Sequence, residues 1–76
     1  MPEIKAATLV IAIQAVKQRI DALEAAQKED GVSEEEMADL DEMLLAHDTA
    51  AEDLKRAYDA ARETDAKLPQ YGWLTR

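Results

Sequence analysis

The sequence contains no cysteine and no phenylalanine, only one histidine, and only two glycines and two prolines. Without cysteine the chain forms no disulfide and none of the common cysteine-based zinc sites, and one histidine is too few for a multi-histidine metal site. A β-domain normally contains more aromatic, β-branched and turn residues than this chain has. We therefore expect an all-α fold that holds no metal and no cofactor.

Long apolar runs are also absent. The most apolar stretch, residues 6–13, is far shorter than the roughly 20 residues that a membrane-spanning helix needs. Charged residues follow it where a signal peptide would have its small-residue cleavage site. We expect no membrane partner and a cytoplasmic location.

Two helices are marked by residues at their ends. Pro2 and Glu3 suit a first helical turn, and Gly31 suits the left-handed conformation that follows a helix end. Ser33 followed by Glu36 is a capping box, which begins a second helix. One domain is predicted, with a helix over 3–29, a turn at 30–33, a longer helix over 34–67 and an aromatic tail over 68–76.

Apolar residues recur at alternating steps of three and four in both helices, which places them on one stripe of each helix. The predicted stripes consist of Leu9, Ile13, Val16, Ile20 and Leu23, and of Met37, Leu40, Leu44, His47, Leu54 and Tyr58. A short connection makes the helices antiparallel. The result is a coiled-coil-like hairpin in which residues whose numbers add up to about 63 face each other.

Both helices carry more apolar residues than one hairpin seam uses. Outside the stripes lie Ile4, Ala7, Val10, Ile11, Ala12, Met43, Leu45, Ala46, Ala50, Ala57 and Ala60. A helix that is apolar most of the way round belongs inside a larger assembly, and chains this short bury only about 60% of their unfolded surface. We predict a homodimer that forms a four-helix bundle; the alternative is an apolar partner in another protein.

Negative charge is concentrated near the predicted turn. Between Gly31 and Asp53 there are nine acidic residues and no lysine or arginine, whereas the net charge of the chain is −8. Carboxylates in the first helical turn stabilise the helix dipole, but those further along gain little from it. Asp39, Asp41 and Glu42 are therefore candidate contacts for a basic protein surface, unless they only increase solubility. Nucleic acid is disfavoured, because phosphate contacts need positive charge.

The tail contains the only tryptophan. Tyr71, Trp73 and Leu74 form a candidate docking segment, since tryptophan and tyrosine are frequent interface anchors. Alternatively the tail folds back and covers the open end of the hairpin with Trp73. In both cases we expect Trp73 to be at least partly buried.

His47 is a polar residue on an apolar stripe. Such a residue usually fixes register or partner choice in a helical bundle; the alternative is a pH-sensitive interface. No serine or cysteine is spaced to form a catalytic relay with it, so we expect no enzyme.

The sequence therefore predicts a small, non-enzymatic protein-binding module. Such a module would inhibit, adapt or chaperone a partner protein through the acidic face, the aromatic tail or both. Two alternatives remain: a structural subunit whose apolar stripe completes a larger helical complex, and an RNA-binding hairpin regulator. The net charge of −8 disfavours the last of these.

Overall fold

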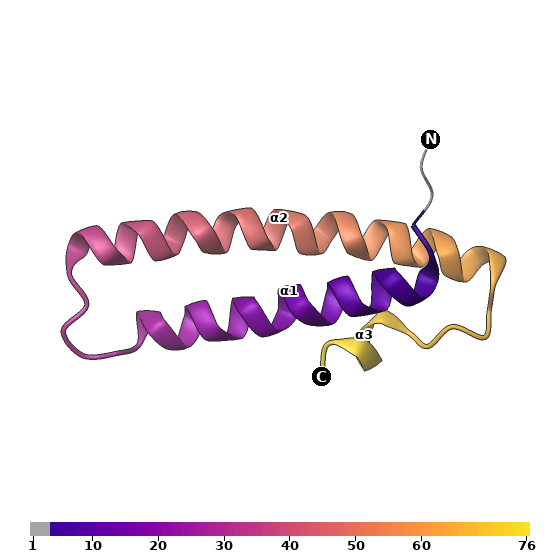
Figure 1. The fold of residues 1–76 in the computed structure, drawn as a ribbon, viewed down its shortest axis with the longest axis horizontal. Coiled ribbons are helices and arrows are strands. Elements are labelled where there is room, and N and C mark those ends of the chain that lie inside the picture. The colour runs from indigo at the N-terminus through magenta and orange to yellow at the C-terminus, as the bar shows by residue number, and fades with distance from the viewer. Residues whose placement is uncertain (1–3) are drawn as a thin grey trace.

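The computed structural model describes residues 4–76 and contains three helices. They are α1 (Ala6–Gln27), α2 (Glu34–Thr64) and a single turn, α3 (Tyr71–Leu74). The two long helices lie side by side and antiparallel, and the chain after α2 folds back toward α1 (Figure 1). Within residues 4–76 no strand occurs, and no helix has the length and apolar character that crossing a bilayer requires. The prediction of an all-α helical hairpin is confirmed.

The first helix is shorter than the predicted segment over 3–29. Ala6 is its first helical residue, and Lys5 before it has an extended backbone. At the other end, the N–H groups of Lys28 and Glu29 donate to carbonyls three residues earlier, at 3.1 and 3.3 Å. These bonds tighten the last turn and end the α-helical pattern. The signals predicted at positions 2 and 3 lie outside the described residues.

In the connection between the long helices, Ser33 has its predicted capping role, and Gly31 has its predicted left-handed conformation but lies four residues after the last residue of α1. Gly31 has a positive φ of 81°, a conformation that glycine adopts without strain. The Ser33 hydroxyl accepts a hydrogen bond from the Glu36 N–H at 3.1 Å and so caps α2. Three glutamates follow in the first turn of α2, where they stabilise the positive end of its dipole.

The long helices differ in length, with 22 residues in α1 and 31 in α2. The Gln27 amide donates to the Asp41 carboxylate at 2.6 Å, and Tyr58 packs against Leu9 and Ile13. In each of these facing pairs the two residue numbers add up to more than the predicted value of about 63. Relative to the predicted register, α2 is therefore shifted along α1 by about one turn. Its first turn therefore projects beyond the end of α1, at the left of Figure 1.

The second helix ends at Thr64, before the predicted residue 67. The Asp65 carboxylate accepts a hydrogen bond from the Lys67 N–H at 3.0 Å, and the Leu68 N–H donates to the Asp65 carbonyl at 3.2 Å. Aspartate bonded to the backbone two residues ahead favours a turn over a helix. This turn redirects residues 68–76 back along the hairpin (Figure 1).

The core lies near the two chain ends. Leu9, Ile13 and Tyr58 are buried together there, and Leu23 is buried separately toward the turn. The Tyr58 hydroxyl donates to the Pro69 carbonyl at 2.6 Å, so the most buried side chain leaves no unsatisfied polar atom. The other predicted stripe residues are half-buried: Val16, Ile20, Met37, Leu40, Leu44, His47 and Leu54.

Candidate partner-binding surfaces

The acidic segment, residues 34–53, forms the part of α2 nearest the turn. Its nine acidic residues are all exposed. Of the ion pairs among residues 4–76, only the Asp53–Arg56 pair involves one of these carboxylates. The rest of the segment keeps its negative charge facing solvent, without a cation from the same hairpin.

The three candidate acidic contacts do not share one face. Asp41 faces α1, where it accepts the hydrogen bond from Gln27. Asp39 lies on a different flank of α2 from Asp41, because residues two apart on a helix do not face each other, and there it approaches Ala26 near the end of α1. Glu42 is exposed. Among residues 4–76 no three potential metal-binding side chains form a group that suits an ion. The negative charge therefore surrounds the first half of α2.

A hollow of about 260 Å³ lies beneath the projecting start of α2. It is lined by Ala26, Glu29, Val32, Glu36, Asp39, Leu40 and Met43. It exists because α1 ends early and α2 extends past it, so the last turn of α1, the connection and the first turns of α2 border an open space. This hollow was not predicted from the sequence, since the predicted register placed the two helix ends side by side.

The tail separates its three candidate contacts into two groups. Tyr71 and Leu74 pack against the core of Leu9, Ile13 and Tyr58, so they stabilise the hairpin itself. Trp73 is 63% exposed, and the Arg76 guanidinium lies 3.6 Å from the centre of its ring. The tail does fold back, but Trp73 does not cover the core. Tyr71 and Leu74 do so instead, because their side chains point inward from the α3 turn.

The folded tail covers only one face of the hairpin. On that face, the Lys55 ammonium lies 5.7 Å from the centre of the Tyr71 ring, and the Arg62 Nε donates to the Leu68 carbonyl at 3.2 Å. The opposite face of α2 has its own apolar repeat at steps of four and three. We call it the open face, and it consists of His47, Ala50 and Ala57 on α2, with Ala12 and Val16 on α1, and with Leu54 and Ala61, which also pack against the buried cluster.

His47 lies on the open face. Its Nδ1 is 2.7 Å from the Met43 carbonyl, one turn earlier in α2. This hydrogen bond holds the imidazole along its own helix, so the ring makes no polar contact with α1 in this arrangement. Its predicted role in fixing register therefore remains a prediction about an assembly of two chains.

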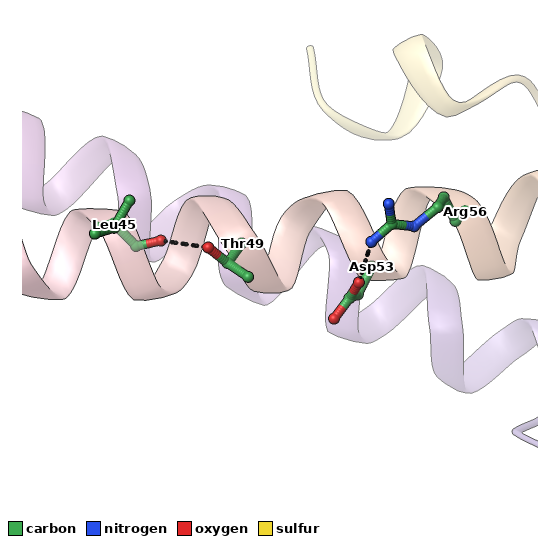
Figure 2. Close-up of polar contacts among 4 residues, drawn as sticks. All are labelled: Leu45, Thr49, Asp53 and Arg56. Carbon is green, nitrogen blue, oxygen red and sulfur yellow. Dashed lines mark hydrogen bonds and ion pairs between the residues drawn. The ribbon is translucent and has the colours of Figure 1, made fainter.

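An exposed leucine within the acidic segment was not among the candidate contacts. Leu45 is 69% exposed, and Asp41, Glu42 and Asp48 are its neighbours three and four residues away. Figure 2 shows Leu45 and Thr49 one turn apart on α2, where the Thr49 hydroxyl donates to the Leu45 carbonyl at 3.0 Å. Further along the same helix, Figure 2 shows the Asp53–Arg56 ion pair. The sequence did contain a signal for Leu45, since it is an apolar residue outside the hairpin seam.

Comparison with known proteins identifies the family of the chain that carries these surfaces. Residues 2–74 match the family described as "T6SS, Immune protein Tsi2-like". The chain belongs to this Tsi2-like family. It is 38% identical over 68 residues to Immune protein Tsi2 of Pseudomonas aeruginosa, an alignment that covers 90% of this chain and 86% of the relative. No solved structure matches the chain significantly.

Membership in the Tsi2-like family bears directly on function. Immune proteins of this kind act by binding and inhibiting a partner effector, and not by catalysis. The coarse prediction of a protein-binding module that modulates a partner is therefore confirmed at the level of the family, and inhibition is the one of its three predicted modes that fits an immune protein.

Proposed function

We propose that this Tsi2-like protein inhibits a T6SS effector by binding a basic surface of the effector with its acidic segment. The observation that carries the proposal is the lack of neutralisation: within residues 4–76, Asp53 alone of the nine carboxylates has a cation partner. Charge placed beyond the first turn of α2 does little for the helix. It does accelerate association with an oppositely charged surface and selects against wrong partners.

Leu45 and Trp73 are the apolar contacts that we propose beside the charges. Leu45 is surrounded by carboxylates. When a partner binds, the leucine would become the buried apolar centre of the contact, and the carboxylates would form its polar rim. Trp73 is exposed and its ring is held by Arg76. A tryptophan that loses little freedom on binding is a frequent hot spot.

We also propose that two hairpins associate through their open faces into a four-helix bundle. The open face repeats at steps of four and three, the spacing of helix–helix seams, and its alanines allow close approach of neighbouring helices. Asp41, Glu42 and Asp48, together with Leu45 and Trp73, lie off this face and stay accessible in such a dimer.

The dimer is tested by placing a large cation on the open face. Ala57→Arg should convert a dimer into a monomer in sedimentation equilibrium, because an unpaired charge would be buried at the seam. Ala22→Arg adds the same residue on the outward side of α1 and serves as the matched control. A dimer that survives Ala57→Arg, or a wild-type chain that is monomeric at all concentrations, contradicts the proposal.

The acidic contact is tested with the effector captured from the native host and then purified. Asp41→Lys combined with Glu42→Lys should weaken effector binding at least about ten-fold, mainly through a slower association rate. Glu24→Lys combined with Glu63→Lys changes the net charge equally outside the acidic segment and should have a much smaller effect. Equal losses in both variants would mean that only net charge matters; no inhibition by the wild-type protein would contradict the function itself.

Two further parts of the proposal rest on the sequence alone. We propose that the protein acts in the cytoplasm and binds no nucleic acid. Cell fractionation with an antibody against the chain tests the first. Co-purification of nucleic acid at low salt, detected by absorbance, would contradict the second.

A further inference from the structure

The hollow under the start of α2 combines two kinds of lining. Ala26, Val32, Leu40 and Met43 contribute apolar atoms, and Glu29, Glu36 and Asp39 contribute carboxylates. The apolar residues are half-buried or nearly so, with Met43 37% exposed, while the three acidic residues are exposed. The hollow therefore has an apolar floor and a negatively charged rim.

The sign of the charge at this site is decided by its side chains. α1 ends here with the negative end of its dipole, and α2 begins here with the positive end, so the two contributions oppose each other. None of the three rim carboxylates takes part in an ion pair among residues 4–76. The rim thus carries unneutralised negative charge over an apolar floor.

The volume limits what the hollow accepts. At about 260 Å³ it is smaller than the roughly 300–1,000 Å³ of sites for drug-sized ligands. It suits one long side chain. Lysine and arginine place an aliphatic stem on apolar surface and keep the charged group in water, which matches a floor of methyl groups under a rim of carboxylates.

We infer that this hollow binds a lysine or arginine side chain of the protein partner, with the stem on Val32, Leu40 and Met43 and the cation among the rim carboxylates. The inference deepens the proposed function and rests on it for the identity of the partner. A second copy of this chain is less suited, because its segment 31–53 offers no lysine or arginine. A symmetric approach of two turn ends would also bring like charges together.

The chemistry of the site is tested without the effector. The full-length protein, labelled at its methyl groups, is titrated with n-butylguanidinium and observed by NMR. Guanidinium supplies the charge without the stem, and n-butanol supplies the stem without the charge. We expect saturable shifts of the Val32, Leu40 and Met43 methyl signals with n-butylguanidinium in the millimolar range, since so small a ligand has few atoms to contribute. Each control compound should bind much more weakly.

Two matched variants separate the rim from the rest of the acidic segment. The rim variant carries Glu29→Gln, Glu36→Gln and Asp39→Asn, and the control variant carries Glu42→Gln, Asp48→Asn and Glu52→Gln. Both lose the same three charges. We expect about a five-fold weaker affinity for n-butylguanidinium in the rim variant, since each exposed ion pair is weak and three are lost. The control variant should stay within about two-fold, because its carboxylates lie outside the hollow.

The outcomes distinguish the site from the function. Equal binding of n-butylguanidinium and either control compound, or equal loss in both variants, would overturn the inference and leave the effector proposal intact. A third result would also overturn the inference: the wild-type protein does not respond to the compound, and the rim variant no longer dimerises. The hollow would then belong to the contact between two copies of the chain. If the compound binds as expected but no effector is inhibited, the site stands and the proposed function fails.

Discussion

The two ends of the hairpin are built differently. The end that holds the chain termini contains the buried cluster of Leu9, Ile13 and Tyr58, and the folded tail covers it. The turn end has only Leu23 fully buried, and it contains the hollow and the rim carboxylates. Stability is therefore concentrated at one end, while exposed charge and incompletely packed surface are concentrated at the other.

This difference shows how a short chain without disulfides can keep an accessible charged surface. Binding elements are commonly drawn from the less stable parts of a protein. Here the tail increases burial at the terminal end without covering the acidic segment. The comparison predicts that substitutions at the terminal end change global stability, whereas substitutions at the turn end act locally.

The largest effect is expected from Tyr58→Ala. Tyr58 is fully buried and donates a hydrogen bond to Pro69, so its removal should lower the free energy of unfolding by about 3–5 kcal/mol, as for other large aromatic residues in cores. Urea denaturation followed by circular dichroism measures the change. The half-buried Met37 near the turn is the control, and Met37→Ala should have a clearly smaller effect. Equal losses would mean that the two ends contribute equally.

At the turn end, the Ser33 cap should have the next largest effect. Ser33→Ala removes the acceptor of the 3.1 Å bond from the Glu36 N–H and should destabilise the protein by about 1 kcal/mol. Amide exchange measured by NMR should become faster in the first turn of α2 and remain unchanged around Tyr58. Ser33→Asp keeps an acceptor and should restore protection. Faster exchange at both ends would show that they unfold together.

The attachment of the tail should have a smaller effect. Tyr58→Phe keeps the ring but removes the hydroxyl that donates to the Pro69 carbonyl, which should cost about 0.5–1.5 kcal/mol. Trp73 fluorescence and amide exchange in residues 70–76 should report a looser tail. Tyr71→Phe is the control, because no hydrogen bond of its hydroxyl is seen among residues 4–76. An unchanged tail in Tyr58→Phe would mean that apolar packing alone holds it.

The sequence predicted the parts of the fold that depend on local chemistry. Ser33 and Gly31 have unambiguous roles at helix ends, and the three-four spacing identified Leu9, Ile13 and Tyr58 as inward-facing. The register was not predictable, because a shift by one helical turn moves one apolar residue to the position of another. The hollow depends on that register, so the sequence pattern could not identify Val32 and Leu40 as lining residues.

The tail shows the same limit for the candidate site. Its apolar residues predicted either a buried segment or a docking segment, and in the structure one part of the tail is packed on the core while another part is exposed. Tyr71 and Leu74 pack on the core, while Trp73 remains exposed beside Arg76. The division depends on where the Asp65 turn directs the chain. Composition identifies the aromatic residues, but only the three-dimensional path of the tail separates their roles.

The smallest effect is expected at Lys17, which lies between the two ends. Its ammonium donates to the Asp21 carboxylate at 2.7 Å, and this bond, together with the charge of Asp21, raises the pKa of Lys17 above its ordinary value. A raised pKa in the folded state means that the pair stabilises the fold below the unfolded-state pKa, near 10.4. That contribution is lost as the pH rises through the folded-state pKa.

An NMR titration of the Lys17 side chain should therefore give a midpoint above that of Asp21→Asn, in which the acceptor charge is removed. The difference between the two midpoints, and not the wild-type curve alone, measures the contribution of the pair. Added salt should reduce this difference, since both side chains of the pair are partly exposed to solvent. Equal midpoints would show that the pair does not persist in solution. The middle of the hairpin would then lack even a weak electrostatic link, and the contrast between its stable terminal end and its open turn end would be sharper.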